Sequence, residues 1–340
     1  MNRPAAGPHP TRRTVLLASP RSFCAGAERA IEVVERALAR FGAPVYVRRQ
    51  IVHNVHVCLA LERAGAVFVG EVDEAPPGAL CVLSAHGVAP AVRARAGRRL
   101  RVIDATCPLV TRVHRDARRL VEAGHRVVLI GHPGHDEVEG TLGEAPGRID
   151  VVSRPEQVAY LPYAAGDPVA YLTQTTLAAD EVDAVVAALR RRFPRLHAPG
   201  ARGVCYATAN RQRAVRELAV RCGIVLVIGS AASSNSRRLV EVARREGCEA
   251  RLLEDAGELD PRWLAGIDTV GVTAGASTPN RLVDEVVEAL AALGPIVVGE
   301  HRVADESMRF LLPPELRRVE DREMGDGRAR TARRAAGSGR

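Results

Sequence analysis

Residues 101–110 have the sequence RVIDATCPLV, in which a short strand-like run leads to Cys107 and then into a helix. After this cysteine, apolar side chains recur at spacings of three and four residues, which is typical of a helix with one face on a core. The segments around Cys24 and Cys205 have the same pattern, with strand-like runs expected at 14–18 and 203–204. The sequence therefore predicts three helices that each begin at a cysteine.

The segments that follow the three cysteines repeat one another. A strand follows each helix, and the offset from Cys107 to the end of its strand, Gly131, equals the offset from Cys205 to Gly229. Each strand leads into a polar loop, and a later second strand ends in another polar stretch. Strands that alternate with helices are typical of parallel α/β units. In such sheets, functional groups gather at the carboxyl ends of the strands.

The predicted organisation is therefore an α/β fold made of three repeats. Repeat 1 spans residues 14–106, repeat 2 spans 107–204, and repeat 3 with a C-terminal segment spans 205–316. Each repeat presents one cysteine and two polar loops at the same edge of its sheet. Residues 1–13 and 317–340 are rich in Gly, Ala, Pro and Arg, and we expect them to be disordered basic tails.

The charge of the chain excludes several classes of function. All 48 basic residues are arginine, so a Walker A lysine and a Schiff-base lysine are both excluded. The net charge is +8, but most of the excess lies in the two tails and the body is close to neutral. Nucleic-acid binding needs a basic face on the folded body, and aromatic residues are only 3% of the chain. We expect no nucleic-acid partner.

We expect a cytoplasmic protein without a membrane segment. No apolar run approaches the roughly 20 residues that a span requires, and the short apolar stretch after Arg12 and Arg13 is not a signal sequence. The seven cysteines are odd in number, and a disulfide framework is not expected in that compartment. Four of them are expected to be buried as small hydrophobic side chains: Cys58, Cys81, Cys222 and Cys248.

The other three cysteines are candidates for a shared site. At helix N-termini the helix dipole favours their thiolates. Three thiolates can bind zinc together with one other ligand, or they can hold an iron–sulfur cluster that has one iron without a cysteine. They are also compatible with three merely buried cysteines. The residues alone leave these alternatives open.

The polar loops supply candidate ligands for an anion or a metal. One group is formed by three histidines, His53, His86 and His135, and a second group offers hydroxyl and amide donors without lysine or a glycine-rich loop: Ser233, Ser234, Asn235 and Ser277. A Ser-Ser-Asn run is also a common helix cap. Glu137 is either a solvated carboxylate or a proton donor that faces the cysteines. Thr175 ends a strand, where threonines usually satisfy backbone groups.

These residues lie in motifs that resemble the 4-hydroxy-3-methylbut-2-enyl diphosphate reductases, the LytB family. The motifs occur in the family's order over residues 14–316: PRSFCAG at 20–26, IVHN at 51–54, SAHGV at 84–88, DATCPLV at 104–110, HDEVEGT at 135–141, TQTTL at 173–177, CYAT at 205–208, NRQ at 210–212, SSNS at 233–236 and GVTAGAS at 271–277. Few positions depart from the family pattern. Ser22 replaces a usual Gly, Arg112 a frequent Lys, Asp136 a usual Pro and Ala178 a common Ser.

The resemblance implies a trefoil of three pseudo-threefold-related lobes around one central [4Fe-4S] cluster. Cys24, Cys107 and Cys205 would hold this cluster, and the iron without a cysteine would bind the substrate oxygen. The resemblance further implies that Glu137 supplies a proton and that Thr175 lies close to the reacting hydroxyl. The residues implied to bind the substrate diphosphate are His53, His86, His135, Ser233, Ser234, Asn235 and Ser277, together with Thr175.

The implied activity is the two-electron reductive dehydroxylation of (E)-4-hydroxy-3-methylbut-2-enyl diphosphate. Its products are isopentenyl and dimethylallyl diphosphate, and it is the last step of the non-mevalonate (methylerythritol phosphate) route to isoprenoids. A nicotinamide or flavin fingerprint is absent from the sequence, so a ferredoxin or a flavodoxin is the expected electron donor. Two alternatives remain at this stage: a zinc-dependent diphosphate hydrolase, and an iron–sulfur sensor that is not an enzyme.

Overall fold

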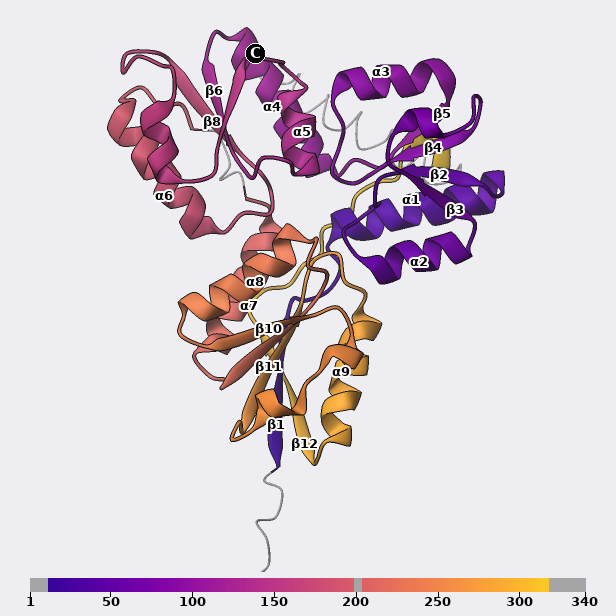
Figure 1. Ribbon diagram of the computed structural model, residues 1–340, viewed down its shortest axis with the longest axis vertical. Coiled ribbons are helices and arrows are strands. Elements are labelled where there is room, and N and C mark those ends of the chain that lie inside the picture. Colours follow the sequence, from indigo (N-terminus) through magenta and orange to yellow (C-terminus); the bar gives the residue numbers. More distant parts are fainter. Residues whose placement is uncertain (1–11, 199–203, 318–340) are drawn as a thin grey trace, which may run out of the picture.

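Three lobes, each with its own parallel β-sheet, make up the part of the chain that the structure describes, residues 12–198 and 204–317 of this computed structural model. The lobes surround a common centre (Figure 1). This arrangement confirms the predicted α/β fold with three trefoil-like lobes. In the described residues, no helix is both long enough and apolar enough to cross a membrane.

The first lobe contains the strand order β3-β2-β4-β5. Its strands are β2 (Val45–Arg48), β3 (Ala66–Val69), β4 (Leu80–Leu83) and β5 (Arg101–Asp104). Its helices are α1 (Ala25–Phe41), α2 (Val55–Arg63) and α3 (Pro90–Arg99). Every residue of β4 is buried, as expected for a parallel strand that is covered on both faces.

The second lobe contains the order β7-β6-β8. Its strands are β6 (Arg126–Ile130), β7 (Ile149–Val152) and β8 (Val169–Thr173), and its helices are α4 (Pro108–Glu122), α5 (Asp136–Leu142) and α6 (Ala179–Arg192).

The third lobe contains the order β10-β9-β11-β1-β12. Its strands are β1 (Arg13–Ser19), β9 (Ile224–Ile228), β10 (Glu249–Leu253), β11 (Thr269–Ala274) and β12 (Ile296–Arg302), and its helices are α7 (Tyr206–Ala219), α8 (Ser234–Arg245) and α9 (Asn280–Ala292).

The three sheets share one topology at their centres. The first strand after each cysteine helix lies between the two strands that follow it, so β2 lies between β3 and β4, β6 between β7 and β8, and β9 between β10 and β11. All of these pairs are parallel. The carboxyl ends of the three central strands therefore present equivalent loops, as the repeat in the sequence predicted.

The position of β1 differs from the predicted boundary of repeat 1. We assigned residues 14–18 to that repeat, but β1 pairs with β11 and β12 of the third sheet. The physical reason is that the strand before each cysteine pairs with the sheet of one lobe, whereas the helix after that cysteine belongs to the next lobe around the centre. β5, which precedes Cys107, pairs with β4, and a single bridge from Ala170 to His197 takes the equivalent place before Cys205. The chain's first strand thus closes the ring of lobes.

Other expectations fall at the edges of the described residues. Val204 belongs to no strand, and Gly203 lies outside the described residues, so the strand expected at 203–204 is not seen in the part that is described. The expected tails lie outside the description as well, apart from their innermost residues. Among these, Arg13 begins β1, and Arg317 donates from Nε to the carbonyl oxygen of Leu312 at 2.7 Å.

Candidate functional site

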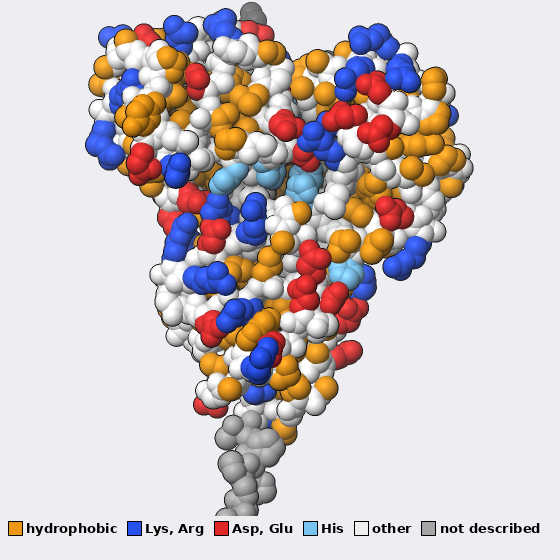
Figure 2. Space-filling view, in the orientation of Figure 1, with side chains coloured by type: hydrophobic (Ala, Val, Ile, Leu, Met, Phe, Trp, Pro, Cys, Tyr) orange, Lys and Arg blue, Asp and Glu red, His pale blue; other side chains and the backbone are white. Residues whose placement is uncertain are grey.

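All of the predicted site residues line one cavity of about 100 Å³ between the lobes. Figure 2 shows histidine side chains in the hollow where the three lobes meet, with basic side chains beside them. The cavity residues that the sequence predicted are Cys24, His53, His86, Cys107, His135, Glu137, Thr175, Cys205, Ser233, Ser234, Asn235 and Ser277. The structure therefore brings together side chains from all three lobes.

The three cysteines occupy equivalent positions, each at the N-cap of a helix. Cys24 precedes α1, Cys107 precedes α4 and Cys205 precedes α7. The backbone N–H of each cysteine donates to a carbonyl oxygen in the loop that follows one of the strands β11, β4 and β8. These acceptors are Ala276 at 3.0 Å for Cys24, Ala85 at 2.9 Å for Cys107 and Thr175 at 3.1 Å for Cys205. The polar loops thus fix the backbone of the cysteines.

The side chains of Cys24 and Cys107 both approach the backbone of Gly26. A Cβ atom built on Gly26 would lie 2.8 Å from Sγ of Cys107 and 3.7 Å from Sγ of Cys24. The N–H of Ala27 donates to Sγ of Cys24 at 3.4 Å. Glycine is therefore required at position 26, because any larger residue would occupy the space that the sulfur atoms share.

The electrostatics of the cysteines differ from the expectation that helix N-termini favour their thiolates. Burial and the charges of Cys24 and Cys205 raise the pKa of Cys107 to about 12. Burial and the charge of Cys24 raise the pKa of Cys205 to about 11. Backbone N–H groups at the helix ends lower both pKa values, but burial and mutual repulsion outweigh them. Three thiolates can coexist here only beside a cationic centre, and this donor set fits a thiolate-bound cluster or zinc.

The four remaining cysteines do not line the cavity. Cys58, Cys81 and Cys248 are buried, as predicted, whereas Cys222 is only partly buried. Burial raises the pKa of Cys58 and Cys81 to about 11. These cysteines are therefore neutral thiols near pH 7 and act as packing groups.

Glu137 is held in the cavity by Thr175. The N–H of Thr175 donates to Oε2 of Glu137 at 2.9 Å, and its hydroxyl donates to the same carboxylate at 2.9 and 3.0 Å. Glu137 is only 6% exposed. Burial raises the pKa of Glu137, while the bonds from Thr175 and the charges of His53 and His114 oppose the rise. Burial thus favours a protonated carboxyl, which is the form that can deliver a proton.

The three histidines contact one another around the same cavity. The rings of His53 and His86 stack with centroids 4.1 Å apart, and the His135 ring meets both of them edge-on. Burial lowers the pKa of His53, His86 and His135 alike, and each is further lowered by a neighbouring histidine. In the ligand-free cavity they are therefore neutral.

Each histidine uses Nδ1 toward the protein and leaves Nε2 for a ligand. Nδ1 of His53 lies 3.3 Å from Oε1 of Gln50. Nδ1 of His135 accepts from the N–H of Glu137 at 3.1 Å, so its proton sits on Nε2. Nδ1 of His86 lies 3.7 Å from Oδ2 of Asp136. Nε2 of each ring has no hydrogen-bond partner in the described residues and is free for a ligand.

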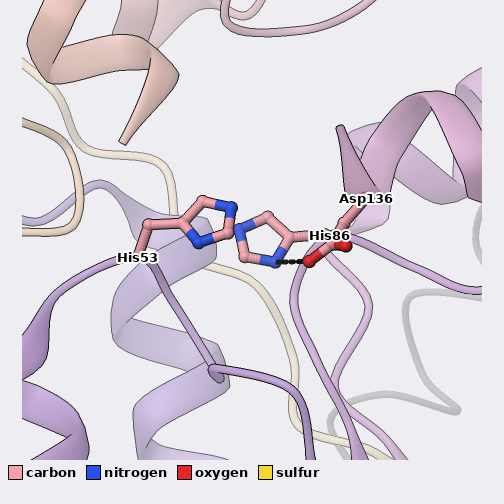
Figure 3. A group of neighbouring side chains, drawn as sticks. All are labelled: His53, His86 and Asp136. Atoms are coloured by element: carbon pink, nitrogen blue, oxygen red, sulfur yellow. Dashed lines mark ion pairs between the residues drawn. The ribbon is translucent and has the colours of Figure 1, made fainter. Parts of the chain in front are cut away.

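His53, His86 and Asp136 also form a possible metal-binding group, since one ligand atom of each lies within 4.8 Å of the others (Figure 3). Two features oppose a metal. The ring planes of His53 and His86 are only 18° apart, so their lone pairs, which lie in the ring planes, do not converge on one ion. Asp136 is also already paired with Arg49. The geometry favours an anion site over a metal site.

The third lobe contributes hydroxyl and amide groups. Ser233 caps α8 by accepting from the N–H of Ser236 at 3.3 Å, so the capping interpretation of the Ser-Ser-Asn run holds for this residue. The hydroxyl of Ser277 donates to the carbonyl oxygen of His53 at 3.1 Å. Both polar atoms of the Asn235 side chain are buried without a partner in the described residues. An unpaired buried amide beside a cavity is suited to a polar ligand.

Sequence reasoning missed two buried arginines that position the cysteines. Arg29 on α1 donates to the carbonyl oxygens of Ala105 and Thr106, both at 3.1 Å, immediately before Cys107. Arg211 on α7 donates to the carbonyl oxygen of Ser22 at 2.7 Å, just before Cys24. The helix from one cysteine thus fixes the loop that carries another. The only signal in the sequence was an arginine within two helical turns after each of Cys24 and Cys205.

Comparisons with known proteins agree with the motif assignment. The family described as LytB protein matches residues 15–291. The 4-hydroxy-3-methylbut-2-enyl diphosphate reductase 1 of Mycobacterium tuberculosis is 55% identical over 309 residues, which cover 89% of this chain and 94% of that protein. The reductase of Acidothermus cellulolyticus is 54% identical over 92% of both chains. A solved reductase structure from Plasmodium falciparum has a TM-score of 0.87 and 34% identity, and it covers 92% of this chain and 99% of that one.

Proposed function

Because this chain belongs to the LytB family, we propose that it is a 4-hydroxy-3-methylbut-2-enyl diphosphate reductase. The substrate takes up two electrons and two protons, its C–O bond breaks, and the oxygen leaves as water. The second proton joins either end of the allyl unit, which gives isopentenyl or dimethylallyl diphosphate. The observation that carries this proposal is the convergence of three cysteines, a buried glutamate and three histidines in one cavity.

Cys24, Cys107 and Cys205 would hold a [4Fe-4S] cluster. When bound, such a cluster supplies single electrons and the Lewis-acid character of an iron without a cysteine. The close approach of Gly26 to two sulfur atoms and the position of all three cysteines at helix N-caps beside one cavity support this assignment. A small acidic redox protein, a ferredoxin or a flavodoxin, is the proposed electron donor.

Histidines and hydroxyls would bind the substrate by its diphosphate. Nε2–H of His135 is a donor in the neutral ring, and the free amide of Asn235 adds donors from the opposite lobe. Ser233, Ser234 and Ser277 would complete the phosphate pocket at the start of α8 and beside His53. Such a pocket needs no lysine, which agrees with the composition of the chain.

Glu137 would deliver the proton that lets the oxygen leave as water. Its carboxyl is held on one side by Thr175, whose hydroxyl is also proposed to lie near the reacting hydroxyl of the substrate. Replacing Glu137 with Gln is expected to abolish turnover and to leave substrate binding within about threefold of the unsubstituted protein. Glu139→Gln is the matched control, because Glu139 lies on the same helix and does not line the cavity.

Anaerobic purification tests the proposal as a whole. We expect brown protein with about four irons and four sulfides per chain that reduces the allylic diphosphate with dithionite and a viologen. Colourless protein with stoichiometric zinc would contradict the reductase and favour the hydrolase. An intact cluster without reduction of the substrate would favour the sensor. Near-normal turnover of the Glu137→Gln variant would remove Glu137 from its role.

A further inference from the structure

Asp136 lies between two proposed diphosphate ligands and a cation from another lobe. It is the first residue of α5 and follows His135 directly. Its two carboxylate oxygens have different partners: Oδ1 accepts from Nη1 of Arg49, and Oδ2 lies 3.7 Å from Nδ1 of His86. The Asp136 and His86 side chains are each only 12% exposed, so their interaction is poorly screened.

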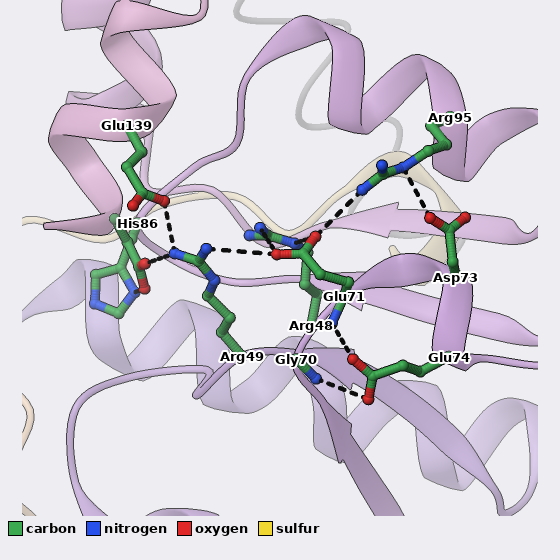
Figure 4. A network of polar contacts seen from close by, with 10 residues as sticks. Arg48, Arg49, Gly70, Glu71, Asp73, Glu74, His86, Arg95 and Glu139 are labelled. Atoms are coloured by element: carbon green, nitrogen blue, oxygen red, sulfur yellow. Dashed lines mark hydrogen bonds and ion pairs between the residues drawn. The ribbon is translucent and has the colours of Figure 1, made fainter. Parts of the chain in front are cut away.

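Arg49 anchors this carboxylate from the first lobe. Its backbone has a positive φ of 53° directly after β2, a conformation that is costly for a side chain with a Cβ. From there the guanidinium also reaches Glu139 at 2.8 Å and Glu71 at 3.4 Å (Figure 4). Arg49 therefore fixes Oδ1 of Asp136 and leaves Oδ2 facing His86.

Of the three cavity histidines in the described residues, His86 alone has an Nδ1 without a hydrogen-bond partner. That atom is buried and makes no hydrogen bond within the described residues. Burial, His53, His135 and Arg49 hold the pKa of His86 well below its ordinary value. The ring is therefore neutral in the free cavity, which accounts for a separation from Asp136 that exceeds a hydrogen bond. A diphosphate on the other side of the ring would reverse this balance, because its charge favours the imidazolium.

We propose that Asp136 is a positioning residue for His86. In the complex, Oδ2 of Asp136 accepts the Nδ1 proton of His86, and the ring takes up a second proton on Nε2 that it donates to the diphosphate. The only bond formed is the N–H bond on Nε2, its proton comes from solvent, and the diphosphate itself keeps all of its bonds. This inference rests on the proposed function, since it needs an anionic ligand in the cavity. It adds that part of the ligand affinity comes from proton uptake controlled by Asp136.

The pH dependence has to be assigned among several groups around His86. His53 and Arg49 face it from the loop after β2, and His135 and Asp136 face it from the start of α5. Arg237 on α8 acts on His53 and His135 and lowers the pKa of both. Of these groups, Asp136 alone bears a negative charge and lies beside Nδ1 of His86. Its removal should therefore lower the pKa of His86 in the complex.

The experiment is calorimetric titration of the anaerobically prepared holoenzyme with inorganic diphosphate. Titrations in two buffers of different ionisation enthalpy give the number of protons taken up, and a pH series from 6 to 8.5 gives the affinity. At pH 6 we expect Asp136→Asn to raise Kd about tenfold, the effect of one pKa unit, and between pH 7 and 8 to take up about half a proton fewer. Because the unsubstituted protein takes up more protons on binding, the ratio of Kd values should fall toward one as the pH rises to 8.5.

Two further variants make the result specific. Glu139→Gln removes another partner of Arg49 without touching His86, and it should match the unsubstituted protein within about twofold. Asp136→Pro removes the carboxylate at the first residue of a helix, where proline is tolerated, and serves if the Asn variant fails to fold. With saturating allylic substrate, kcat of both Asp136 variants should stay within about twofold, because Asp136 does not line the cavity.

The outcomes separate this inference from the proposed function. If the unsubstituted protein does not bind diphosphate, the phosphate site is wrong, and the function falls with the inference. If it binds but Asp136→Asn takes up the same number of protons across the pH series, with equal or tighter Kd at pH 6, Asp136 only repels the ligand and the inference alone is overturned. An equal loss of diphosphate affinity in Asp136→Asn and Glu139→Gln would also overturn the inference. Asp136 would then act only through its ion pair with Arg49, which joins the first and second lobes.

Discussion

Replacing Arg211 with Leu should destabilise the protein more than any exposed substitution on the same helix. The guanidinium is fully buried and forms an ion pair with Glu306 at 3.1 Å. It also donates to the carbonyl oxygens of Ser22, at 2.7 and 3.1 Å, and of Phe23, at 3.1 Å. Leucine would leave these carbonyls without this donor and Glu306 without its cation. Removing one partner of a buried ion pair costs about 3–5 kcal/mol.

The assay is denaturant unfolding of the reduced, metal-free protein, followed by circular dichroism. Arg216→Leu is the control: Arg216 is 35% exposed and its ion pairs are 3.6 and 3.9 Å long, so its loss should cost about 0–1 kcal/mol. The double variant Arg211→Leu with Glu306→Leu should recover part of the loss, because no charge is then left unpaired. A loss below about 1 kcal/mol for Arg211→Leu, or a double variant as unstable as the sum of both single variants, would refute the reasoning.

Two further predictions concern the cavity. Gly26→Ala should lower the iron content per chain after anaerobic reconstitution, because its Cβ would lie 2.8 Å from Sγ of Cys107. Gly97→Ala is the control and should leave the iron content unchanged, because its Cβ meets nothing within 4 Å. Equal iron content in both variants would disprove the steric argument. The raised pKa of Glu137 means that its burial costs stability as the pH rises through that pKa. Glu137→Gln should therefore raise the unfolding free energy of the metal-free protein more at pH 8 than at pH 5, as measured by denaturant unfolding. A larger gain at pH 5 than at pH 8 would show that the folded protein stabilises the ionised carboxylate.

The cysteines and polar loops were predictable from the sequence because their signals are local. A helix-starting cysteine, a strand at a constant offset and a polar loop at its end are each defined within a few residues. The rule that parallel strands present functional groups at their carboxyl ends then brings distant loops such as His53, His135 and Asn235 together. The structure places all of these side chains at one cavity.

The supporting charges were not predictable in the same way. Amphipathic patterning assigns an arginine to the solvent-facing side of a helix, but Arg29 and Arg211 are buried because carbonyl groups of the segments that connect the lobes surround their guanidinium groups. The pair of Arg49 and Asp136 joins two lobes, and neither residue lies on an apolar stripe that would mark it. Such contacts depend on how the lobes meet, which the pattern of a single segment does not contain.

The place of β1 shows how the fold couples the chain's ends to the site. β1 lies between β11 and β12, so it is an internal strand of the last sheet rather than an edge strand of the first. Cys24 follows β1 closely, and its N–H donates to Ala276, directly after β11. The first proposed ligand is therefore in position only when strands from both ends of the chain have paired. Pairing over such separations has a high loop-closure cost, so we expect the cysteine site to be completed late in folding, by the closure of the third sheet.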